Sequence, residues 1–432
     1  MRILLIHQNF PGQYKHLGPA LVARGDDVYA LTPKVQKPTM WKGVKVIPYM
    51  INRRSSKDAH PWIIDLEAKI VRGEACYDAA MALKKKGFSP DIILAHHGWG
   101  ESLFLKDVWP EARMGLYCEF FHHADDNQIG FDPEFPRKNN AKDALRLRVR
   151  NLNNHLHFRI AEAGISPTHF QADTFTAAFR DQITVMHDGV DTGLLVKNAD
   201  AVLKVSDTLS LTRNDEVITF INRNLEPYRG YHQFMRALPK LLKLRPDAHV
   251  VLLGGNEVSY GEKAPEGKTW KQIYIDEVKD QISEQDWARV HFMGRVPYES
   301  FLAMLQVSRV HVYLTYPFVL SWSFLEAMRA ECAIVASDTA PVKEAIIDGE
   351  NGVLVDFFDP LALAAKVDHL LNDPQRRERL GRTARETIVK NYDLRSHCLP
   401  QTMAWVDRLS QLPVKAFSKT YRSFFHIAIR NG

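Results

Sequence analysis

Short apolar runs alternate with amphipathic stretches along the whole chain. In the first half these runs cover residues 2–7, 27–32, 44–49, 91–97, 113–121 and 183–188. In the second half they cover residues 216–223, 248–255, 290–296, 310–316, 333–338 and 352–357. Strands that are apolar at nearly every position are buried on both faces, which is typical of parallel sheets covered by helices. The pattern predicts an α/β protein with two doubly wound, Rossmann-like domains in tandem.

A polar, irregular stretch at 197–216 separates the two halves of this pattern. We therefore expect an N-terminal domain of residues 1–192 and a C-terminal domain of residues 193–404. Open α/β sheets bind ligands at the carboxyl ends of their strands. Two such sheets facing each other across a cleft favour a small anionic ligand, and a nucleotide is the simplest choice.

Composition excludes several classes of protein. A chain of 432 residues, 45% hydrophobic and 25% charged, is typical of a soluble globular protein with more than one core. No apolar run approaches the roughly eighteen residues of a membrane span, and the opening run, which breaks at His7, is too short for a signal peptide. Four scattered cysteines indicate reduced thiols and a cytoplasmic location. The net charge of +5 allows an anionic ligand or membrane surface, and the absence of a recognisable motif argues against nucleic acid.

Two arginines follow a buried strand of the second half. Arg223 ends the run at 216–223, and Arg229 lies just before the next helix. Two guanidiniums suit a diphosphate because each forms forked, charge-assisted hydrogen bonds to phosphate oxygens. Surface arginines on a loop are the alternative. Two other strand ends carry Gly254-Gly255 and Gly294-Arg295-Val296, where a backbone can approach a ligand closely.

The stretch YPFVLSWSFLEAM at 316–328 predicts a helix that begins at Ser321, a good N-cap. A helix amino terminus offers free N–H groups and a positive dipole end to a phosphate. Glu326, within the same helix, is placed to accept hydrogen bonds from a ribose diol. The alternative, a partly exposed acid near a helix start, is weaker because its neighbours Leu325, Ala327 and Met328 are apolar.

The order of these motifs resembles the donor half of family-4 glycosyltransferases of the GT-B fold. The likeness includes Arg…Arg-Gly, Gly-Gly, GRVP, LEAM and DTAPVKEAIIDGENGVLVDFFDP. It extends into the first half through HQNFPGQY, FFHH and VMHDGVDT, and so covers nearly the whole chain. The resemblance implies a retaining, metal-independent enzyme without a cofactor. It would move a sugar from a nucleoside-diphosphate sugar to a glycan or lipid-linked acceptor in cell-surface polysaccharide or lipopolysaccharide-type synthesis.

The resemblance also implies roles for single residues. Arg223 and Arg229 hold the donor diphosphate, although the family usually has Lys at the second position and one residue less between them. His122 lies near the reacting carbon, and Gly12 lies close to the diphosphate and the acceptor. Backbone N–H groups of Ser321, Trp322 and Ser323 cradle the distal phosphate, and Glu326 binds the ribose. Gly254, Gly255, Arg295 and Val296 complete the nucleotide site.

Phe318 departs from the family pattern. The family has two glutamates eight positions apart, and the first touches hydroxyls of the donor sugar. Here that position is Phe318, whose ring accepts no such hydrogen bond. The identity of the donor, and to a lesser extent catalysis, is therefore open.

Several other features leave alternatives. His122, His123, Asp125 and Asp126 contain metal-ligand types, but we expect no metal and favour an acceptor pocket or a helix cap. His96 and His97 are expected to be packed or hydrogen-bonded. The basic run at 137–151, with Lys138, Lys142, Arg146, Arg148 and Arg150, favours a solvated helix face slightly over an anionic acceptor or a leaflet surface.

The carboxyl-terminal residues 405–432 are expected to pack back on the first domain, and a peripheral contact with the inner membrane face is the alternative. Two rival functions also stay open. One is a sugar-nucleotide epimerase or hydrolase on the same fold. The other is a non-catalytic partner subunit that keeps the fold.

Overall fold

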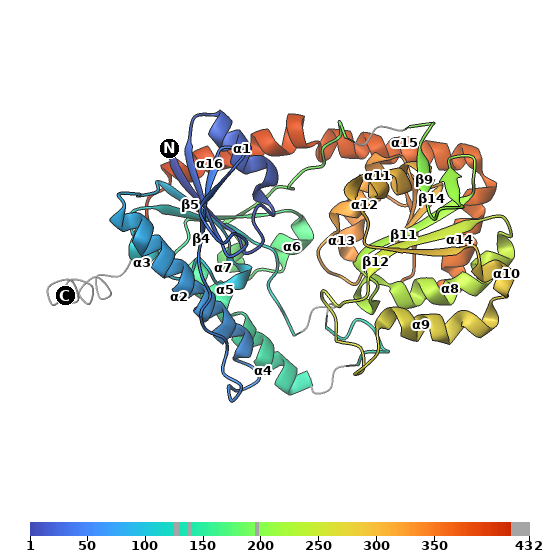
Figure 1. The fold of residues 1–432 in the computed structure, drawn as a ribbon, viewed down its shortest axis with the longest axis horizontal. Helices are drawn as coiled ribbons and strands as arrows, with labels where there is room; N and C mark the ends of the chain where they lie inside the picture. Colours follow the sequence, from blue (N-terminus) through green and yellow to red (C-terminus); the bar gives the residue numbers. More distant parts are fainter. Residues whose placement is uncertain (125–128, 137–139, 195–197, 416–432) are drawn as a thin grey trace. The chain divides into compact units, whose positions relative to one another are not determined.

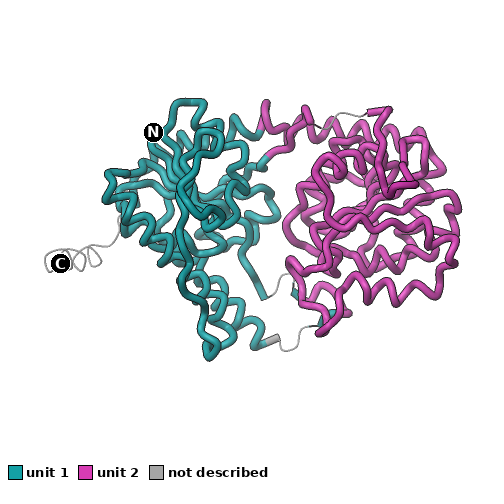
Figure 2. The backbone as a smooth tube through the Cα atoms, viewed as in Figure 1, with its two compact units in different colours: residues 1–129, 135–188, 398–432 teal, residues 130–134, 189–397 magenta. Residues whose placement is uncertain are grey.

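A computed structural model gives the fold, and it describes residues 1–124, 129–136, 140–194 and 198–415. The chain divides into two compact units, coloured separately in Figure 2. Unit 1 comprises residues 1–129, 135–188 and 398–432, and unit 2 comprises residues 130–134 and 189–397. The chain passes from unit 1 to unit 2 after residue 188, where the sequence led us to expect 192. It returns at residue 398, before the expected 405.

Unit 1 is built on an eight-stranded sheet with the order β3-β4-β2-β1-β5-β6-β7-β8. Every neighbouring pair is parallel except β3 and β4, which are antiparallel. The strands are β1 (Arg2–Ile6), β2 (Asp27–Thr32), β3 (Thr39–Trp41), β4 (Val44–Pro48), β5 (Ile92–His96), β6 (Arg113–Tyr117), β7 (Ala163–Ser166) and β8 (Ile183–Val185). The apolar pattern predicted six of these strands and missed the short β3 and β7.

Helices cover both faces of this sheet (Figure 1). One face packs against α1 and α16, whose Trp405, Val406 and Leu409 are buried, and the other packs against α2 and α3. The helices are α1 (Tyr14–Ala23), α2 (Ile64–Lys85), η1 (His97–Trp99), α3 (Leu105–Val108), α4 (Asn140–Arg150), α5 (Leu152–Phe158), α6 (His169–Asp173), α7 (Ala177–Arg180) and α16 (Leu399–Gln411). Residues 416–432, part of the expected carboxyl-terminal helix, lie outside the described residues.

Unit 2 contains a six-stranded parallel sheet with the order β13-β12-β11-β14-β15-β16. A separate antiparallel pair, β9 and β10, lies within the stretch that we had expected to be irregular. The strands are β9 (Val202–Lys204), β10 (Ser210–Thr212), β11 (Val217–Asn224), β12 (His249–Gly255), β13 (Val290–Gly294), β14 (Val310–Tyr313), β15 (Ala333–Ser337) and β16 (Val353–Val355). Leu203 and Leu211 are buried on the inner face of this hairpin, and their packing against the core stabilises it.

Two apolar cores enclose the sheet of unit 2. One contains side chains of α8, α9 and α14, and the other contains side chains of α11, α12 and α15. The helices are η2 (Pro227–Arg229), α8 (Tyr231–Leu244), α9 (Trp270–Val278), η3 (Lys279–Gln281), α10 (Glu284–Trp287), α11 (Tyr298–Val307), α12 (Trp322–Arg329), α13 (Ala340–Lys343), α14 (Pro360–Asn372), α15 (Pro374–Asn391) and the π-helix η4 (Leu394–Cys398). This arrangement is the expected doubly wound α/β layering.

Candidate donor site

The carboxyl ends of β11, β12, β13 and β14 lie along one edge of the unit 2 sheet, since neighbouring strands are parallel. Arg223 lies at the end of β11 and is exposed, whereas Arg229 follows in η2. Gly254 and Gly255 end β12, and the loop after β14 leads into α12. The donor residues expected in the second half therefore gather at the edge where open α/β sheets bind ligands.

Arg229 is buried, with 5% of its surface exposed. Its Nη1 donates hydrogen bonds to the Thr315 Oγ1 at 2.7 Å, the Val319 carbonyl at 2.9 Å and the Tyr313 hydroxyl at 3.2 Å. All three acceptors belong to β14 or to the loop that follows it. The guanidinium therefore fixes the path of the chain that leads into α12.

No carboxylate forms an ion pair with Arg229 in the part of the chain that the structure describes. The cation is not isolated, because its charge acts on the nearby Glu226 carboxylate. Burial alone would lower the pKa of Arg229, but the surrounding tyrosines Tyr313 and Tyr260 leave it raised, so the group stays charged. The guanidinium therefore places a positive charge at this edge of the sheet.

Glu226 shapes the loop that packs beside this arginine. Its buried carboxylate accepts hydrogen bonds from the backbone N–H groups of Ser259 at 3.1 Å, and of Tyr260 and Gly261 at 3.3 Å. Burial raises the pKa of Glu226, although these N–H groups and the charge of Arg229 oppose the shift. Glu226 thereby holds Tyr260 in place, with the Arg229 guanidinium 5.0 Å from the centre of its ring.

Phe318 forms an aromatic wall with Tyr228, Tyr260 and Tyr316. Its ring is 8% exposed and lies edge-on to Tyr228 at 5.2 Å, 5.1 Å from Tyr260 and 5.8 Å from the Arg229 guanidinium. Tyr228 in turn packs on Tyr316 at 4.6 Å. Phe318 therefore backs the buried cation and has little surface left for a sugar, a placement that the sequence did not predict.

The helix α12 begins beside this wall. Ser321 is its N-cap, but the side chain makes no capping hydrogen bond and instead lies 2.7 Å from the Ser323 hydroxyl. The Ser321 N–H donates to the Tyr313 hydroxyl at 3.0 Å, and Tyr313 also contacts Arg229. One tyrosine thus joins the expected arginine to the expected helix terminus. Trp322, the first residue of the helix, is exposed.

Glu326 lies on α12, half-buried among the apolar side chains Phe324, Leu325 and Ala327. Its Oε1 accepts a hydrogen bond of 2.7 Å from the Tyr298 hydroxyl. This contact fixes the orientation of the carboxylate and also raises the pKa of Tyr298, after burial as the larger cause. The surroundings agree with the buried character that the sequence indicated, and the ribose role remains a prediction.

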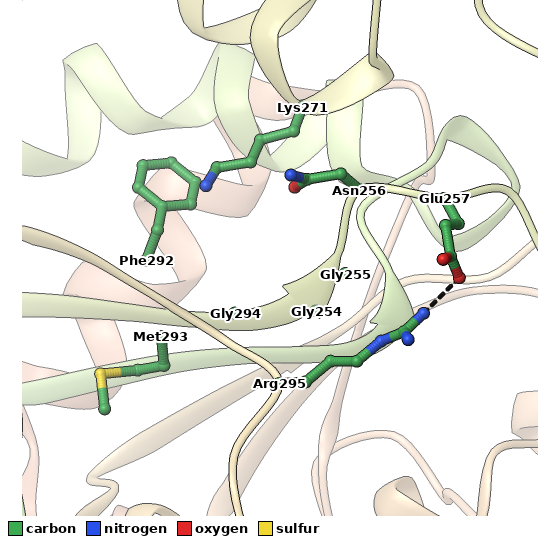
Figure 3. Close-up of a pocket in the computed structure, with 9 residues that line it drawn as sticks. All are labelled: Gly254, Gly255, Asn256, Glu257, Lys271, Phe292, Met293, Gly294 and Arg295. Atoms are coloured by element: carbon green, nitrogen blue, oxygen red, sulfur yellow. Dashed lines mark hydrogen bonds and ion pairs between the residues drawn. The ribbon is translucent and has the colours of Figure 1, made fainter.

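A cavity of about 430 Å³ lies at the ends of β12 and β13 (Figure 3). It is lined by Gly254, Gly255, Asn256, Glu257, Lys271, Phe292, Met293, Gly294 and Arg295. Lys271 points across it, with its Nζ 4.5 Å from the centre of the Phe292 ring. Arg295 pairs with Glu257 and lies 3.4 Å from Asn224. The hydrophobic side chain of Val296, the next residue, packs towards the core.

Gly255 has a steric reason to be glycine. A Cβ there would lie 2.6 Å from the Asn224 Oδ1 and 2.9 Å from the Arg295 Nε, closer than such atoms approach. Larger residues at this position would displace the polar groups that rim the cavity. The expected approach of a ligand to this backbone remains a prediction.

The segment 130–134 also contributes to unit 2, which the sequence did not predict. Asp132 is buried, lies 2.8 Å from the His232 Nε2 and accepts a hydrogen bond of 2.7 Å from the Tyr316 hydroxyl. Glu134 accepts two hydrogen bonds from Arg236, at 2.7 and 3.1 Å. Asp132, Glu134 and His232 are metal-ligand types within reach of one another. The cation of Arg236 beside Glu134 opposes a second cation, so we interpret this cluster as an anchor for the segment.

In unit 1, His122 lies five residues beyond the end of β6, at the carboxyl edge of the sheet. Its backbone N–H donates to the Asn151 Oδ1 at 3.1 Å, and the Asn151 side chain donates back to the His122 carbonyl at 2.5 Å. The ring packs at 5.4 Å from Phe120. His123 bonds to the Thr174 carbonyl. Asp125 and Asp126 lie outside the described residues.

Gly12 covers the ring of His7 at the end of β1. Its φ is +47°, and a Cβ at this position would lie 2.2 Å from two ring atoms of His7. His7 packs edge-on against His96 at 5.4 Å, and His96 stacks on Trp99 at 4.0 Å. Only glycine therefore fits between this aromatic cluster and the first loop.

His97 is buried, with its Nδ1 2.9 Å from the Tyr117 carbonyl and its Nε2 2.6 Å from the side-chain amide of Asn154. It is thus a packed histidine, as the sequence led us to expect. Burial lowers the pKa of His97 and of His96. Both rings are therefore neutral near pH 7 and do not bind anions by charge.

Two family models match successive parts of the chain. One, described as Glycosyl transferase family 4 group, matches residues 24–195, and the other, Glycosyl transferases group 1, matches residues 206–387. Together they span most of the sequence and both units. The chain belongs to the family-4 glycosyltransferases. It is therefore an enzyme of glycosyl transfer.

Relatives and solved structures support this placement. The chain is 25% identical over 421 residues to a glycogen synthase of Mycobacterium tuberculosis, covering 91% of each chain. It is 26% identical over 219 residues to a D-inositol 3-phosphate glycosyltransferase of Corynebacterium efficiens, covering 50% of this chain and 48% of the relative.

Among solved structures, sucrose-phosphate synthase from Thermosynechococcus elongatus is similar, with a TM-score of 0.71, 17% identity and coverage of 94% of this chain and 98% of the other. Anabaena HepE in complex with UDP-glucose gives a TM-score of 0.63 at 16% identity, with coverage of 95% of this chain and 100% of the other. These likenesses establish the GT-B fold, as the sequence predicted. None of the helices in the described part of the chain combines the length and apolar character needed to cross a bilayer.

Several residues that surround the expected positions escaped sequence analysis. In unit 2 they are Glu226, Tyr228, Tyr260, Lys271, Phe292 and Tyr298; in unit 1, His7 and Trp99 surround Gly12 and His96. Most lie in loops or early helical turns after a strand of the sheet, so a search confined to the strand ends missed them. Glu226 stands within the motif LEPYRG that supplied Arg229, and that proximity was an available signal.

Proposed function

We propose that the enzyme transfers a sugar from a nucleoside-diphosphate sugar to a glycan or lipid-linked acceptor. The reaction retains the configuration of the anomeric carbon and needs no metal. It serves the synthesis of cell-surface polysaccharide or a lipopolysaccharide-type glycan. The names of two relatives, a glycogen synthase and a D-inositol 3-phosphate glycosyltransferase, support the transfer of a sugar.

The observation that carries the proposal is the buried Arg229 guanidinium at the ligand-binding edge of the unit 2 sheet. It forms no salt bridge with a carboxylate among the described residues, and it is linked through Tyr313 to the start of α12. A cation and a helix terminus together favour the diphosphate of a nucleotide. The exposed Arg223 at the end of β11 adds a second positive charge there.

The remaining parts of the nucleotide have matching surroundings. Glu326 accepts hydrogen bonds from ribose hydroxyls, replacing or sharing the contact from Tyr298. The cavity beyond Gly255 takes the base, where the backbone at Gly294, Arg295 and Val296 offers hydrogen-bonding groups. Gly12 of the first loop approaches the diphosphate and the acceptor.

These groups act on the bond between the anomeric carbon and the diphosphate oxygen. When this bond breaks, both electrons go to the diphosphate, whose growing charge Arg223, Arg229 and the α12 terminus stabilise. The acceptor hydroxyl bonds to the anomeric carbon, and its proton passes to the departing phosphate oxygen. No separate general acid is needed. His122 contacts the donor sugar near the reacting carbon.

A panel of nucleotides tests the proposal. UDP, GDP and ADP are titrated against the whole chain, and the matching nucleotide is expected to raise the melting temperature. A sugar nucleotide with that base should then lose its sugar to an added glycan acceptor. If no nucleoside diphosphate binds, the donor site is wrongly assigned. Free sugar or an epimer formed without acceptor would favour the rival enzyme class, and binding without turnover would favour a non-catalytic subunit.

A further inference from the structure

The segment 130–134, with the sequence GFDPE, belongs to unit 2, whereas the chain on either side of it belongs to unit 1 (Figure 2). Its last residue, Glu134, accepts the two hydrogen bonds from Arg236 and a third, of 3.2 Å, from the Tyr274 hydroxyl. Phe131 and Asp132 make the contacts nearer its start. Specific side-chain contacts along its length therefore hold this segment in unit 2.

Phe131 packs the segment into an aromatic cluster. Its ring lies 5.1 Å from the Tyr316 ring and 5.2 Å from the ring of Phe357, which is buried in the core of unit 2. A third ring, that of Phe358, lies at 5.0 Å. Aromatic pairs at these distances stabilise a fold beyond the area that they bury. The segment thus has an apolar contact beside its polar ones.

Asp132 is 2% exposed and binds Tyr316 directly. Its Oδ2 accepts the hydrogen bond of 2.7 Å from the Tyr316 hydroxyl and lies 2.8 Å from the His232 Nε2. Its Oδ1 accepts a hydrogen bond of 2.9 Å from the backbone N–H of Glu134. Burial alone would raise the pKa of Asp132, but His232 and Tyr316 leave it lowered, so the group is ionised at neutral pH. The Tyr316 hydroxyl therefore donates a charge-assisted hydrogen bond.

Tyr316 is also part of the surroundings of Arg229. Its backbone N–H donates to the Tyr228 carbonyl at 3.1 Å, and the two tyrosine rings pack at 4.6 Å. Tyr228 directly precedes Arg229 in η2. Thr315, the residue before Tyr316, accepts the shortest of the three hydrogen bonds that Arg229 donates. Tyr316 therefore contacts both the turn that carries Arg229 and the loop that binds its guanidinium.

The hydroxyl of Tyr316 makes the link from Asp132 to this turn. Tyr316 is 5% exposed, so its hydroxyl lies where water reaches it poorly. A buried donor that loses its acceptor is costly and favours movement of the side chain towards solvent. Such a movement of Tyr316 would also remove its ring from Tyr228 and loosen η2.

We propose that Asp132 is a positioning residue of the donor site. It holds Tyr316, and Tyr316 holds the η2 turn and the loop after β14 in the arrangement that places Arg229. The proposal rests on the proposed function, in which Arg229 holds the diphosphate. Because coupling between two binding events is reciprocal, an anion bound at Arg229 also strengthens the docking of the segment 130–134.

Hydrogen exchange of the full chain, followed by mass spectrometry of its peptides, tests the positioning without a ligand. Asp132→Ala removes the carboxylate, and Tyr316→Phe removes only the hydroxyl and keeps the ring. Both variants are expected to speed exchange in residues 226–231 and 314–321, including exchange of the Tyr316 N–H that bonds to Tyr228.

Calorimetric titration with inorganic diphosphate measures the effect on the ligand. Each single variant should bind diphosphate about tenfold more weakly than the parent, which corresponds to about 1.4 kcal/mol. The double variant Asp132→Ala/Tyr316→Phe should bind no more weakly than Asp132→Ala alone, because both changes break the same link. Diphosphate should also slow hydrogen exchange of residues 130–134 in the parent, and Tyr316→Phe should lose this effect.

Tyr49→Phe is the matched control in unit 1. Tyr49 is 1% exposed and its hydroxyl donates to the Glu101 Oε1 at 2.9 Å, so this variant also removes a buried hydrogen bond between a tyrosine and a carboxyl group. In urea unfolding it should lose about as much stability as Tyr316→Phe. Its exchange in residues 226–231 and 314–321 and its affinity for diphosphate should stay at the parental level.

Parental exchange of residues 226–231 and 314–321 in either single variant overturns the proposal. An effect of Asp132→Ala on binding without one of Tyr316→Phe does so as well, since the contact with His232 would then explain it. Additive losses in the double variant, or an equal loss of affinity in Tyr49→Phe, also contradict it. If the parent itself does not bind diphosphate, the proposed function fails, and hydrogen exchange still decides whether Asp132 positions the turn.

Discussion

Arg229→Met offers a sharp test of the donor site, because the structure gives this arginine two separable effects. Methionine keeps an unbranched stem and removes the charge. The three oxygens that Nη1 serves, on Tyr313, Thr315 and Val319, lose their donor. The variant also removes the positive charge that the proposed diphosphate would meet.

The loss of these bonds lowers the stability of the fold. Each lost hydrogen bond costs about 1–3 kcal/mol when its acceptor stays buried and unsatisfied. The raised pKa of Arg229 means that its surroundings favour the cation, so removing the charge does not offset this loss. We therefore expect Arg229→Met to lower the free energy of unfolding by about 3 kcal/mol or more. Binding of a diphosphate weakens as a separate effect, because the ligand loses charge-assisted bonds worth about 1.5–3 kcal/mol, or about ten- to a hundredfold in affinity.

Arg289→Met is the matched control in the same unit. The Arg289 guanidinium also donates to backbone carbonyls, those of Ala248 at 2.6 Å and Arg245 at 2.9 Å, and it pairs with Asp286. It precedes β13 and so lies at the amino edge of the sheet, away from the proposed ligand. This variant should lose stability and keep its affinity for nucleotide.

Calorimetric titration and melting curves measure both quantities. At a nucleotide concentration 100-fold above its dissociation constant, the parent gains about 2.7 kcal/mol, and a variant that binds thirtyfold more weakly gains only about 1 kcal/mol. The reasoning is refuted if folded Arg229→Met binds nucleotide as the parent does. It is refuted equally if Arg289→Met loses affinity to the same extent, since a general loss of structure would then explain both.

Four other predictions follow from the structure. Glu326→Gln should raise the KM for the donor about tenfold, whereas Tyr298→Phe, which only frees the carboxylate, should change it less; inorganic diphosphate should bind all three proteins alike. His122→Ala should lower kcat far more than nucleotide affinity, and equal turnover would remove it from the reacting centre. Phe318→Glu places a carboxylate near the buried guanidinium and should weaken nucleotide binding, whereas Phe318→Leu should not. Burial lowers the pKa of His157 from 6.5 to about 3. As the pH drops below 6.5, the unfolded chain binds a proton that the folded chain does not, so the free energy of unfolding decreases. The loss is about 2 kcal/mol at pH 5, and urea unfolding that gives equal free energies at pH 7 and pH 5 would contradict it.

The apolar pattern predicted the sheets well because parallel strands are buried on both faces. Nearly every residue of such a strand is therefore apolar. It missed β7 because the segment AGIS contains one large apolar residue, Ile165, and so shows no apolar run. It missed the β9–β10 hairpin because only Leu203 and Leu211 are fully buried, and Val202 beside them is 53% exposed. Such a hairpin has one polar face, so its sequence resembles that of a loop.

The sequence predicted which strand ends the candidate residues occupy, but not the contacts that these residues make. Strand ends and the LEAM motif placed Arg229 and Glu326 at one edge of a sheet. The burial of Arg229 depends on Thr315 and Val319, which lie more than eighty residues further along the chain. The docking of residues 130–134 likewise depends on His232 and Tyr316. The local sequence pattern does not show such long-range pairs. An arginine or an aspartate is therefore expected at the surface until its partners are known.

The two departures from the family pattern, Arg at position 229 and Phe at position 318, have one physical explanation. A planar guanidinium stacks on aromatic faces, which the compact ammonium of a lysine does less well. The Arg229 guanidinium lies within 6 Å of the ring centres of both Tyr260 and Phe318. A glutamate at 318 would instead neutralise the cation and compete with a diphosphate for it. An aromatic ring there holds the arginine in place without neutralising it, so Phe318 would support the proposed diphosphate clamp without contacting the sugar.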